Sequence, residues 1–272
     1  MNSSLFSLEG KKIAFSGATG VLGKTMSLHL AAEGAILLIL GRTPAKVDEL
    51  VTEINQSGGK AFGYYTDVTD ETSIHEAASK IESDHGSIDV LINGAGGNMP
   101  GAVITPTQNF LDLDVNSLRK VLDLNYLGTV LPIKALLPLM LKENKGNILN
   151  ISSMAASRPM TRVMGYASAK AAIDNLTKWL SVELTTKHGP EFRVNAIAPG
   201  FFLTEQNRTL LTEADGGLTS RGNQIITHTP MRRFGKPEDL LGALQWLCSD
   251  ASAFVTGTII AVDGGFSAYS GV

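Results

Sequence analysis

Tyr166 and Lys170 stand four residues apart, a spacing that places both side chains on one face of a helix, one turn apart. A free tyrosine ionises at about pH 10, too high for proton transfer at neutral pH, but a neighbouring ammonium stabilises the phenolate and lowers its pKa. Such a phenol can give a proton to a carbonyl oxygen while hydride reaches the carbon, or take it back in reverse. The pair alone is weak evidence, because a packing tyrosine and a solvated lysine would look the same.

A serine hydroxyl could assist this phenol. Ser153 lies 13 residues before Tyr166, just after a predicted strand, where its hydroxyl can hydrogen-bond the same substrate oxygen. Ser152 competes for this role, and either serine could be an ordinary turn residue.

Three glycines, Gly17, Gly20 and Gly23, follow the first predicted strand and open a helical pattern. Glycines let backbone amides close around a phosphate, and the helix N-terminus supplies partial positive charge. The turn therefore favours a nucleotide site, with Thr19 and Leu22 as further backbone contacts. A tight strand-to-helix turn without a ligand is the plain alternative.

The end of the second predicted strand bears on the choice of cofactor. NAD sites of this kind usually carry Asp or Glu about 20 residues beyond the glycines, where it accepts hydrogen bonds from ribose hydroxyls. Residues 36–45 contain neither, and Arg42 stands in that region. A guanidinium suits a 2′-phosphate in charge and geometry, so the sequence favours NADP(H). NAD(H) stays possible, because Arg42 could cap the strand or stack on adenine.

Short apolar runs alternate with longer helical patterns along the chain. The predicted strands are 12–16, 35–40, 61–66, 90–93, 147–152, 193–198 and 258–262, and the predicted helices are 21–33, 44–56, 71–84, 117–143, 167–187 and 237–247. Strands that are apolar on both faces and separated by helices form parallel sheets covered on both sides. The expected fold is α/β, a doubly wound (Rossmann) parallel seven-stranded sheet, in a single domain spanning residues 1–272. Residues 201–236 fit neither pattern and are expected to form a substrate-binding loop or lid.

Taken together, these residues and several others stand in the order and spacing of the short-chain dehydrogenases/reductases, which the chain resembles over nearly its whole length. The resemblance rests on the glycine turn, Asp67-Val68, Asn93-Gly94-Ala95-Gly96, Asn125, Ser153, Tyr166 with Lys170, and Pro199-Gly200. It implies four catalytic residues, with a water held by Asn125 linking Lys170 to solvent: Asn125, Ser153, Tyr166 and Lys170. It also implies cofactor contacts from Asp67, Val68, Asn93, Ala95, Gly96, Tyr166, Lys170, Pro199 and Gly200. The family spacing favours Ser153 over Ser152.

The glycine turn departs from the commonest family pattern, in which the middle glycine stands one residue later, where this chain has Val21. The contacts with a pyrophosphate are therefore left open. Asp67 could also be a helix cap or an Asx turn rather than an adenine contact.

Three stretches resemble the D-mannonate oxidoreductase (fructuronate reductase) group of that family: 93–98, 198–208 and 263–272. Such an enzyme interconverts the ketone of a hexuronate and the alcohol of mannonate. A sugar acid needs hydrogen bonds for its hydroxyls and a cation for its carboxylate. The candidate substrate contacts are Asn98, Arg158, Arg162, Gln206 and Arg208. The arginines could equally be solvated or lie at a subunit contact.

Other functions stay open: a gluconate 5-dehydrogenase-like enzyme, a 3-oxoacyl-thioester reductase, or a nucleotide-sensing regulator that has lost catalysis. A net charge of −3, from 23 basic and 26 acidic residues, gives no footprint for nucleic acid or anionic lipid. The single Cys248 excludes an intrachain disulfide, and the five dispersed histidines suggest no metal site. With no signal peptide or membrane segment apparent, the expected place is the cytoplasm. The resemblance implies a homotetramer or dimer formed through helices 117–143 and 167–187.

Overall fold

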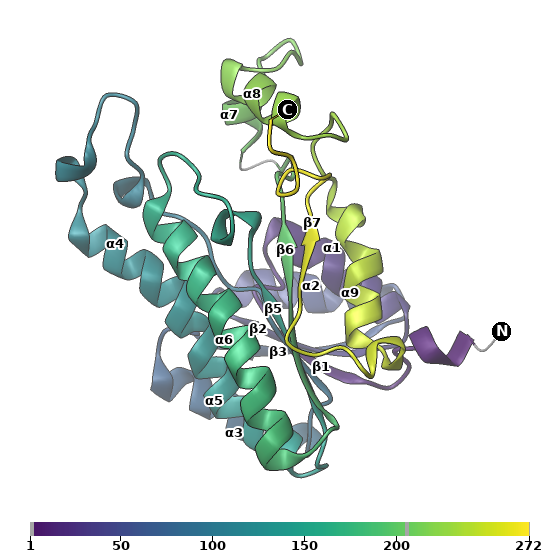
Figure 1. Ribbon diagram of the computed structural model, residues 1–272. Helices are drawn as coiled ribbons and strands as arrows, with labels where there is room; N and C mark the ends of the chain where they lie inside the picture. The colour runs from purple at the N-terminus through teal and green to yellow at the C-terminus, as the bar shows by residue number, and fades with distance from the viewer. Residues whose placement is uncertain (1–2, 205–206, 272) are drawn as a thin grey trace.

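The apolar strands lie side by side in one parallel sheet, in the order β3-β2-β1-β4-β5-β6-β7 (Figure 1). The computed structural model describes residues 3–204 and 207–271. The strands are β1 (Lys12–Ser16), β2 (Ile36–Gly41), β3 (Lys60–Tyr65), β4 (Val90–Asn93), β5 (Gly146–Ile151), β6 (Phe192–Pro199) and β7 (Ile259–Val262). All neighbouring pairs are parallel, so the carboxyl ends of the strands meet at one edge.

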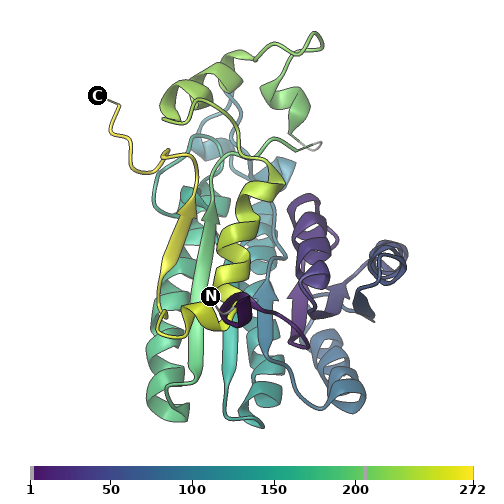
Figure 2. The ribbon, with the colours of Figure 1, turned by 90° about the vertical axis from the view of Figure 1, so that its right-hand side faces the viewer.

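Helices cover both faces of this sheet, as Figures 1 and 2 show. One core cluster joins the sheet to α1 (Val21–Ala32), α2 (Pro44–Gln56) and α9 (Leu241–Cys248). The other joins it to α3 (Glu71–His85), α5 (Gly128–Leu141) and α6 (Met164–His188). Within β1, Ile13 and Phe15 belong to the first cluster and Ala14 to the second, which is the alternation of a strand buried on both faces. The expected doubly wound α/β fold is confirmed.

The predicted helix 117–143 is interrupted in the structure. It begins earlier, as α4 (Val115–Leu122), and joins α5 through one π-helical turn, Asp123–Leu127. By length and composition the stretch Val115–Leu141 could cross a membrane, but half of its most apolar window is buried, as in the core helix of a globular protein. Single 3-10 turns occupy Ser3–Phe6, Pro100–Ala102, Phe110–Asp112, Met154–Ala156, Pro237–Leu240 and Asp250–Ser252.

The segment 201–236 contains two short helices that the sequence pattern did not predict, α7 (Arg208–Leu211) and α8 (Ser220–His228). They stand beyond the carboxyl ends of β6 and β7 (Figures 1 and 2). Backbone hydrogen bonds join the two ends of the segment, since the Gly235 amide donates to Phe201 and the Leu203 amide donates to Gly235. The segment is therefore closed at its base.

The strand order reverses between β1 and β4. From β1 the chain continues to β2 and β3 on one side of the sheet, and β4 then lies on the other side of β1. In open parallel sheets a ligand binds in the crevice outside the carboxyl ends of the strands at such a point. The loops after β1 and β4 contain the glycine turn and the Asn93–Gly96 stretch, so the fold brings these two motifs together.

Candidate active site

The turn between β1 and α1 is packed so closely that two of its positions accept no side chain. Gly17 has a φ of +79°, and a Cβ there would lie 2.3 Å from the carbonyl carbon of Gly94. A Cβ on Gly23 would lie 2.1 Å from the Gly17 oxygen. Gly20 is the N-cap residue of α1 and offers no side-chain cap, so the amides of the first helical turn are left for another partner.

One end of a groove opens beside this turn, with a volume of about 380 Å³. Its lining includes Gly17, Thr19, Gly20, Arg42, Lys46, Asp67, Val68, Ala95 and Gly96. Arg42 and Lys46 bring two exposed cations to its wall from the end of β2 and the start of α2. This is the end at which an adenosine with a 2′-phosphate would find positive charge.

Asp67 forms an Asx turn at this end of the groove. Its carboxylate accepts hydrogen bonds from the Thr69 amide at 2.9 Å and the Thr69 hydroxyl at 2.7 Å. The backbone bond from Thr69 is the main cause that holds the pKa of Asp67 below its usual range. The Asx turn, one of the alternatives to an adenine contact for Asp67, is thus present in the structure. Asp67 also lines the groove, where it could still contact a ligand.

The other end of the groove has a volume of about 400 Å³ and contains the residues that could do chemistry. It shares Gly17, Gly20 and Gly96 with the first end, so the groove is continuous. Its lining includes Leu22, Gly23, Ser153, Tyr166, Lys170, Pro199, Gly200, Phe201, Thr204 and Asn207. Residues from β1, β5, β6 and α6 therefore meet at one edge of the sheet.

Ser153 is the serine that lies beside the phenol. It comes after Ser152 in the loop that follows β5, and its hydroxyl is hydrogen-bonded to Tyr166 in the first turn of α6. The competing Ser152 donates its hydroxyl to the Asp174 carboxylate instead. The choice of Ser153 over Ser152 thus has a structural reason.

Lys170 is buried next to the Tyr166 ring. Its ammonium donates to the Ile151 carbonyl at 2.7 Å and lies 5.6 Å from the ring centroid. Burial lowers the pKa of Lys170 to about 8, against the opposing influence of the Asp174 charge. Burial also raises the pKa of Tyr166, while the hydrogen bond to Ser153 lowers it. The expectation of a lowered Tyr166 pKa was wrong for this state of the groove, because desolvation of the phenolate dominates.

Asn125 lies in the π-helical turn, a departure from regular helix that is frequent at functional sites. Its side-chain oxygen accepts from the Gly97 amide at 3.1 Å, and its amide group donates to the carbonyls of Gly97 at 2.7 Å and Val121 at 2.8 Å. A Cβ on Gly96 would lie 2.6 Å from the Asn125 side-chain oxygen and 3.3 Å from the Lys170 nitrogen. Asn125 and Lys170 therefore converge on one loop.

Asn93 points away from the groove, in contrast with the neighbouring Ala95 and Gly96. Its side chain is buried and donates to Asn150 at 2.9 Å, and Asn150 in turn donates to Thr177 at 2.9 Å. This chain of polar groups joins β4, β5 and α6. The side chain of Asn93 therefore holds the sheet and helix together and does not line the groove.

Of the five predicted substrate contacts, the structure describes four, and none of these four lines the groove. Asn98 accepts a hydrogen bond from the Met99 amide, and the Arg158 guanidinium binds the Ser267 carbonyl at 2.8 and 2.5 Å. Arg208 begins α7 and is exposed. Gln206 lies outside the described residues.

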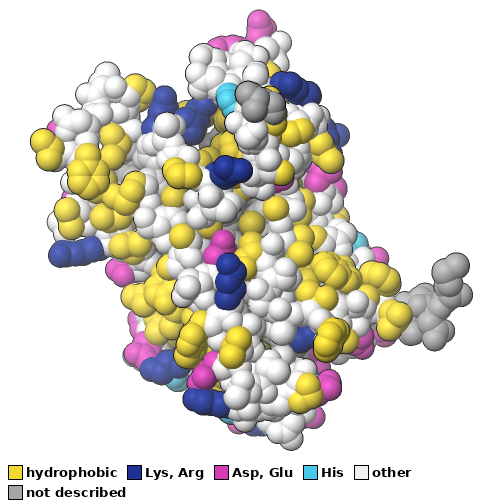
Figure 3. Space-filling model, viewed as in Figure 1, with side chains coloured by type: hydrophobic (Ala, Val, Ile, Leu, Met, Phe, Trp, Pro, Cys, Tyr) yellow, Lys and Arg dark blue, Asp and Glu magenta, His cyan; other side chains and the backbone are white. Residues whose placement is uncertain are grey.

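Arg162 has a second arginine near it that the sequence did not single out. Arg162 has a φ of +76°, a backbone state that side chains rarely adopt. Arg221 in α8 is partly buried, and burial followed by the charge of Arg162 lowers its pKa. Within residues 3–204 and 207–271, neither guanidinium has a carboxylate partner. Figure 3 shows Lys and Arg side chains gathered in a notch beside the lobe that holds α7 and α8.

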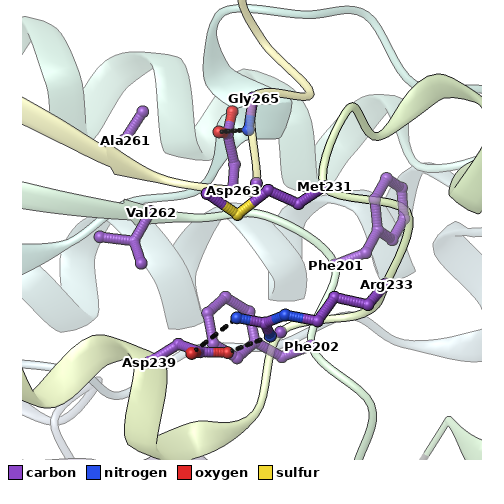
Figure 4. A pocket seen from close by; sticks show the side chains of 11 residues that line it. Phe201, Phe202, Met231, Arg233, Asp239, Ala261, Val262, Asp263 and Gly265 are labelled. Atoms are coloured by element: carbon purple, nitrogen blue, oxygen red, sulfur yellow. Dashed lines mark hydrogen bonds and ion pairs between the residues drawn. The ribbon is translucent and has the colours of Figure 1, made fainter.

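A second cavity of about 350 Å³, drawn in Figure 4, is lined by Phe201 and Phe202, which also line the groove. In its wall Arg233 donates to both oxygens of Asp239, at 2.6 and 3.0 Å. The Phe201 ring also packs edge-on against Phe266 of the C-terminal segment, with centroids 5.2 Å apart. These contacts hold the base of the segment 201–236 in place.

The groove thus has cations and glycine amides at one end and a serine, a phenol and an amine at the other. This arrangement can hold a dinucleotide along its length and exchange a proton with a substrate oxygen. Across the described part of the chain, no group of three or more His, Cys, Asp or Glu side chains could hold a metal ion.

Comparison with known proteins agrees with this geometry. A family model described as enoyl-(acyl carrier protein) reductase matches residues 17–267. An uncharacterised oxidoreductase of Bacillus subtilis, UxuB, is 45% identical to this chain, covering 97% of it and 98% of its own length.

Two solved structures are informative. A Haemophilus influenzae protein with bound NAD, provisionally assigned as a D-mannonate oxidoreductase, superposes with a TM-score of 0.92 at 46% identity and covers 98% of both chains. A gluconate 5-dehydrogenase from Burkholderia cenocepacia, in complex with NADP and tartrate, superposes with a TM-score of 0.86 at 28% identity, covering 97% of this chain and 98% of that one.

Proposed function

Because the chain belongs to the short-chain dehydrogenase/reductase family, whose members are oxidoreductases acting on CH–OH groups, we propose that it interconverts D-fructuronate and D-mannonate. The observation that carries the proposal is the convergence of Ser153, Tyr166 and Lys170 at one end of the groove. A nucleotide-sensing regulator would not need all three.

In this proposal the residues that line the groove would hold a nicotinamide cofactor, which would supply or accept the hydride when bound. Tyr166 gives its phenolic proton to the carbonyl oxygen during reduction and takes it back during oxidation. Ser153 donates a hydrogen bond to the same oxygen and stabilises its developing charge. Lys170 holds positive charge beside the phenol, and Asn125 holds a water that connects Lys170 to solvent.

For the cofactor we favour NADP(H), with NAD(H) as the alternative. Support comes from Arg42 and Lys46 in the wall of the groove and from the absence of an acidic residue at the end of β2. The relatives point both ways, because one structure contains NAD and the other NADP. The proposed contacts along the groove are Gly17, Thr19, Gly20, Leu22, Gly23, Arg42, Asp67, Val68, Ala95, Gly96, Tyr166, Lys170, Pro199 and Gly200.

A sugar acid as substrate is supported by the relatives and by two guanidiniums that have no carboxylate partner within residues 3–204 and 207–271. Arg162 and Arg221 repel each other in the absence of an anion, and a carboxylate between them would relieve that repulsion. Arg221 belongs to the segment 201–236, which we assign as the substrate lid of a single domain. Arg158 is better explained by its bond to Ser267 than by substrate binding. Gluconate oxidation at carbon 5 is the second candidate, because of the likeness to a gluconate 5-dehydrogenase.

The test is a panel of hexuronates and aldonates assayed with NADPH and NADH, following reduced nicotinamide at about 340 nm. We expect turnover with fructuronate and a higher kcat/KM with NADPH. Arg162→Ala and Arg221→Ala should each raise KM for the acid about 10-fold or more with little change in the KM of the cofactor. Turnover of gluconate or a 3-oxoacyl thioester in place of fructuronate would contradict the substrate assignment, and no turnover with either nicotinamide would remove the function. We further expect a cytoplasmic homotetramer.

A further inference from the structure

Residues 263–269, which follow β7, form a compact turn at the carboxyl edge of the sheet, and we call it the C-terminal turn. The Asp263 carboxylate accepts hydrogen bonds from the Gly265 amide (Figure 4) and the Ser267 amide, each at 2.8 Å. The Phe266 amide donates to the Asp263 carbonyl at 3.2 Å. These internal hydrogen bonds give the turn a defined shape, although the proposed chemistry makes no use of it.

The C-terminal turn packs against the start of the segment 201–236. Gly200 lies so close to it that a Cβ there would be 2.6 Å from the Cα of Asp263. The next residue, Phe201, packs its ring edge-on against Phe266, with centroids 5.2 Å apart. Phe201 also lines the end of the groove that contains the serine, the phenol and the amine. The turn therefore lies directly behind one wall of that end.

The same turn contacts the segment 201–236 near its other end. The Met231 amide donates to the Gly264 carbonyl at 3.1 Å. A Cβ on Gly265 would lie 3.1 Å from the Pro230 ring, so the two backbones pack closely. The C-terminal turn thus touches the segment where it leaves the sheet and where it returns.

Arg158 fastens this turn to a third element, the loop after β5. Its Nε and Nη2 groups donate to the Ser267 carbonyl at 2.8 and 2.5 Å, and hydrogen bonds from a charged donor are stronger than those between neutral groups. The Arg158 amide donates to the Met154 carbonyl at 3.1 Å, in the 3-10 turn that Ser153 caps. The guanidinium therefore joins the loop that contains Ser153 to the C-terminal turn.

We propose that Arg158 is a positioning residue for the substrate: it fastens the C-terminal turn, and the turn holds Phe201 and the base of the segment 201–236 at the substrate end of the groove. The proposal rests on the proposed function, which places the substrate beside Ser153 and Tyr166. Arg158 itself is not among the described residues that line the groove, so its influence passes through the turn.

The catalytic groups are held separately from this fastening. Tyr166 and Lys170 stand on α6, and Lys170 is bonded to the Ile151 carbonyl at the end of β5. The C-terminal turn contacts a wall of the site and none of these bonds. Loss of the Arg158 bond should therefore weaken substrate binding and leave proton transfer nearly unchanged.

The first test reads the turn directly and needs no substrate. Arg158→Gln keeps a neutral N–H donor at the place of Nε, whereas Arg158→Met has a side chain of similar length and no donor toward Ser267. Hydrogen exchange of residues 263–269 and 229–231 is followed by mass spectrometry in the full-length protein. We expect Arg158→Met to speed exchange of both stretches at least about fivefold and Arg158→Gln to stay within about twofold. Phe254→Ala, a fully exposed phenylalanine outside the turn, should leave both unchanged.

The second test uses the substrate established by the panel. Arg158→Met should raise KM for the acid about fivefold or more, with kcat and the cofactor Kd changed less than about twofold, and Arg158→Gln should restore most of the loss. Phe266→Ala should raise KM in the same way. Because both residues act through one turn, the double variant should be no worse than the poorer single variant.

Several results would contradict this role. If the Arg158 charge bound the substrate itself, Arg158→Gln would be as poor as Arg158→Met, and the effects of Arg158→Met and Phe266→Ala would multiply. A merely structural role would lower kcat and weaken cofactor binding together with substrate binding. Unchanged exchange in Arg158→Met would overturn the proposal whatever the panel shows. Failure of the panel beside the expected exchange pattern would count against the proposed function, while the fastening of the turn would stand.

Discussion

At the scale of single residues, the phenolic oxygen of Tyr166 is the atom on which the proposed chemistry depends. It is hydrogen-bonded to Ser153, and Lys170 lies beside its ring. The residue is partly buried, and a phenylalanine would bury the same ring. The oxygen can therefore be removed with little change to the groove.

We expect Tyr166→Phe to lower kcat by about 100-fold or more, because general acid–base catalysis contributes about 10²–10⁴-fold. Binding of NADPH, followed by its fluorescence, should change less than about twofold. Tyr126→Phe, a partly buried tyrosine in the π-helical turn, is the control and should retain turnover. Equal activity of Tyr166→Phe and the unmodified protein would favour the regulator over the enzyme.

The serine, tyrosine and lysine could be predicted from the sequence because their spacing is local and the elements that carry them are strongly patterned. The influence of Arg162 on Arg221 could not, because it depends on where the segment 201–236 lies relative to the loop before α6. Asn93 was predicted to contact the cofactor because it stands next to Gly94-Ala95-Gly96. In the structure its side chain is buried and bonded to Asn150, so it points into the sheet and away from the groove. No local pattern distinguishes these two directions.

At the scale of elements, strongly periodic segments matched their predictions closely. The predicted strands 12–16 and 90–93 and the helix 44–56 agree with β1, β4 and α2 residue for residue. The π-helical turn was missed because α5 is apolar around most of its circumference, so a shift in phase by one residue leaves no visible break in the pattern. The short helices α7 and α8 were missed because glycines and a proline interrupt the helical pattern of 201–236, while α7 has only four residues.

The β1–α1 turn offers a test of how much packing depends on one absent side chain. Gly17 and Gly58 have similar φ values, +79° and +85°, but a Cβ at Gly58 would meet no atom within 4 Å. Gly58→Ala should lower the free energy of unfolding by about 1 kcal/mol, from backbone strain alone. Gly17→Ala should lower the free energy of unfolding, measured in urea, by at least about 3 kcal/mol and should weaken cofactor binding, because the added Cβ also clashes with the Gly94 backbone. Equal costs at the two sites would show that the clash relaxes freely.

At the scale of the whole molecule, α6 presents large apolar side chains to solvent. Trp179 is 58% exposed and Val182 is 66% exposed, on the helix expected to form a subunit contact. Exposed apolar groups of this kind usually mark an interface. Light scattering should therefore report a tetramer, and Trp179→Asp should shift the mass toward smaller species. A monomeric unmodified protein would contradict the prediction.

Cys248 gives a chemical measure of global unfolding. The chain has one cysteine, it is 1% exposed, and burial raises the pKa of its thiol to about 12. A thiol reagent should react very slowly with the folded protein at pH 8, and rapidly in urea, where the pKa returns to about 8.5. Fast labelling without urea would mean that α9 opens readily.

Gly20 precedes α1 as an N-cap residue without a side-chain cap, so the amides of the first helical turn gain a strong partner when an anion binds them. A ligand at a hundred times its Kd that binds the folded chain alone adds about 2.7 kcal/mol of stability. In a cell, the survival of this protein against proteolysis should thus follow the size of the dinucleotide pool. Turnover of the polypeptide would then be coupled to the redox metabolism that it serves.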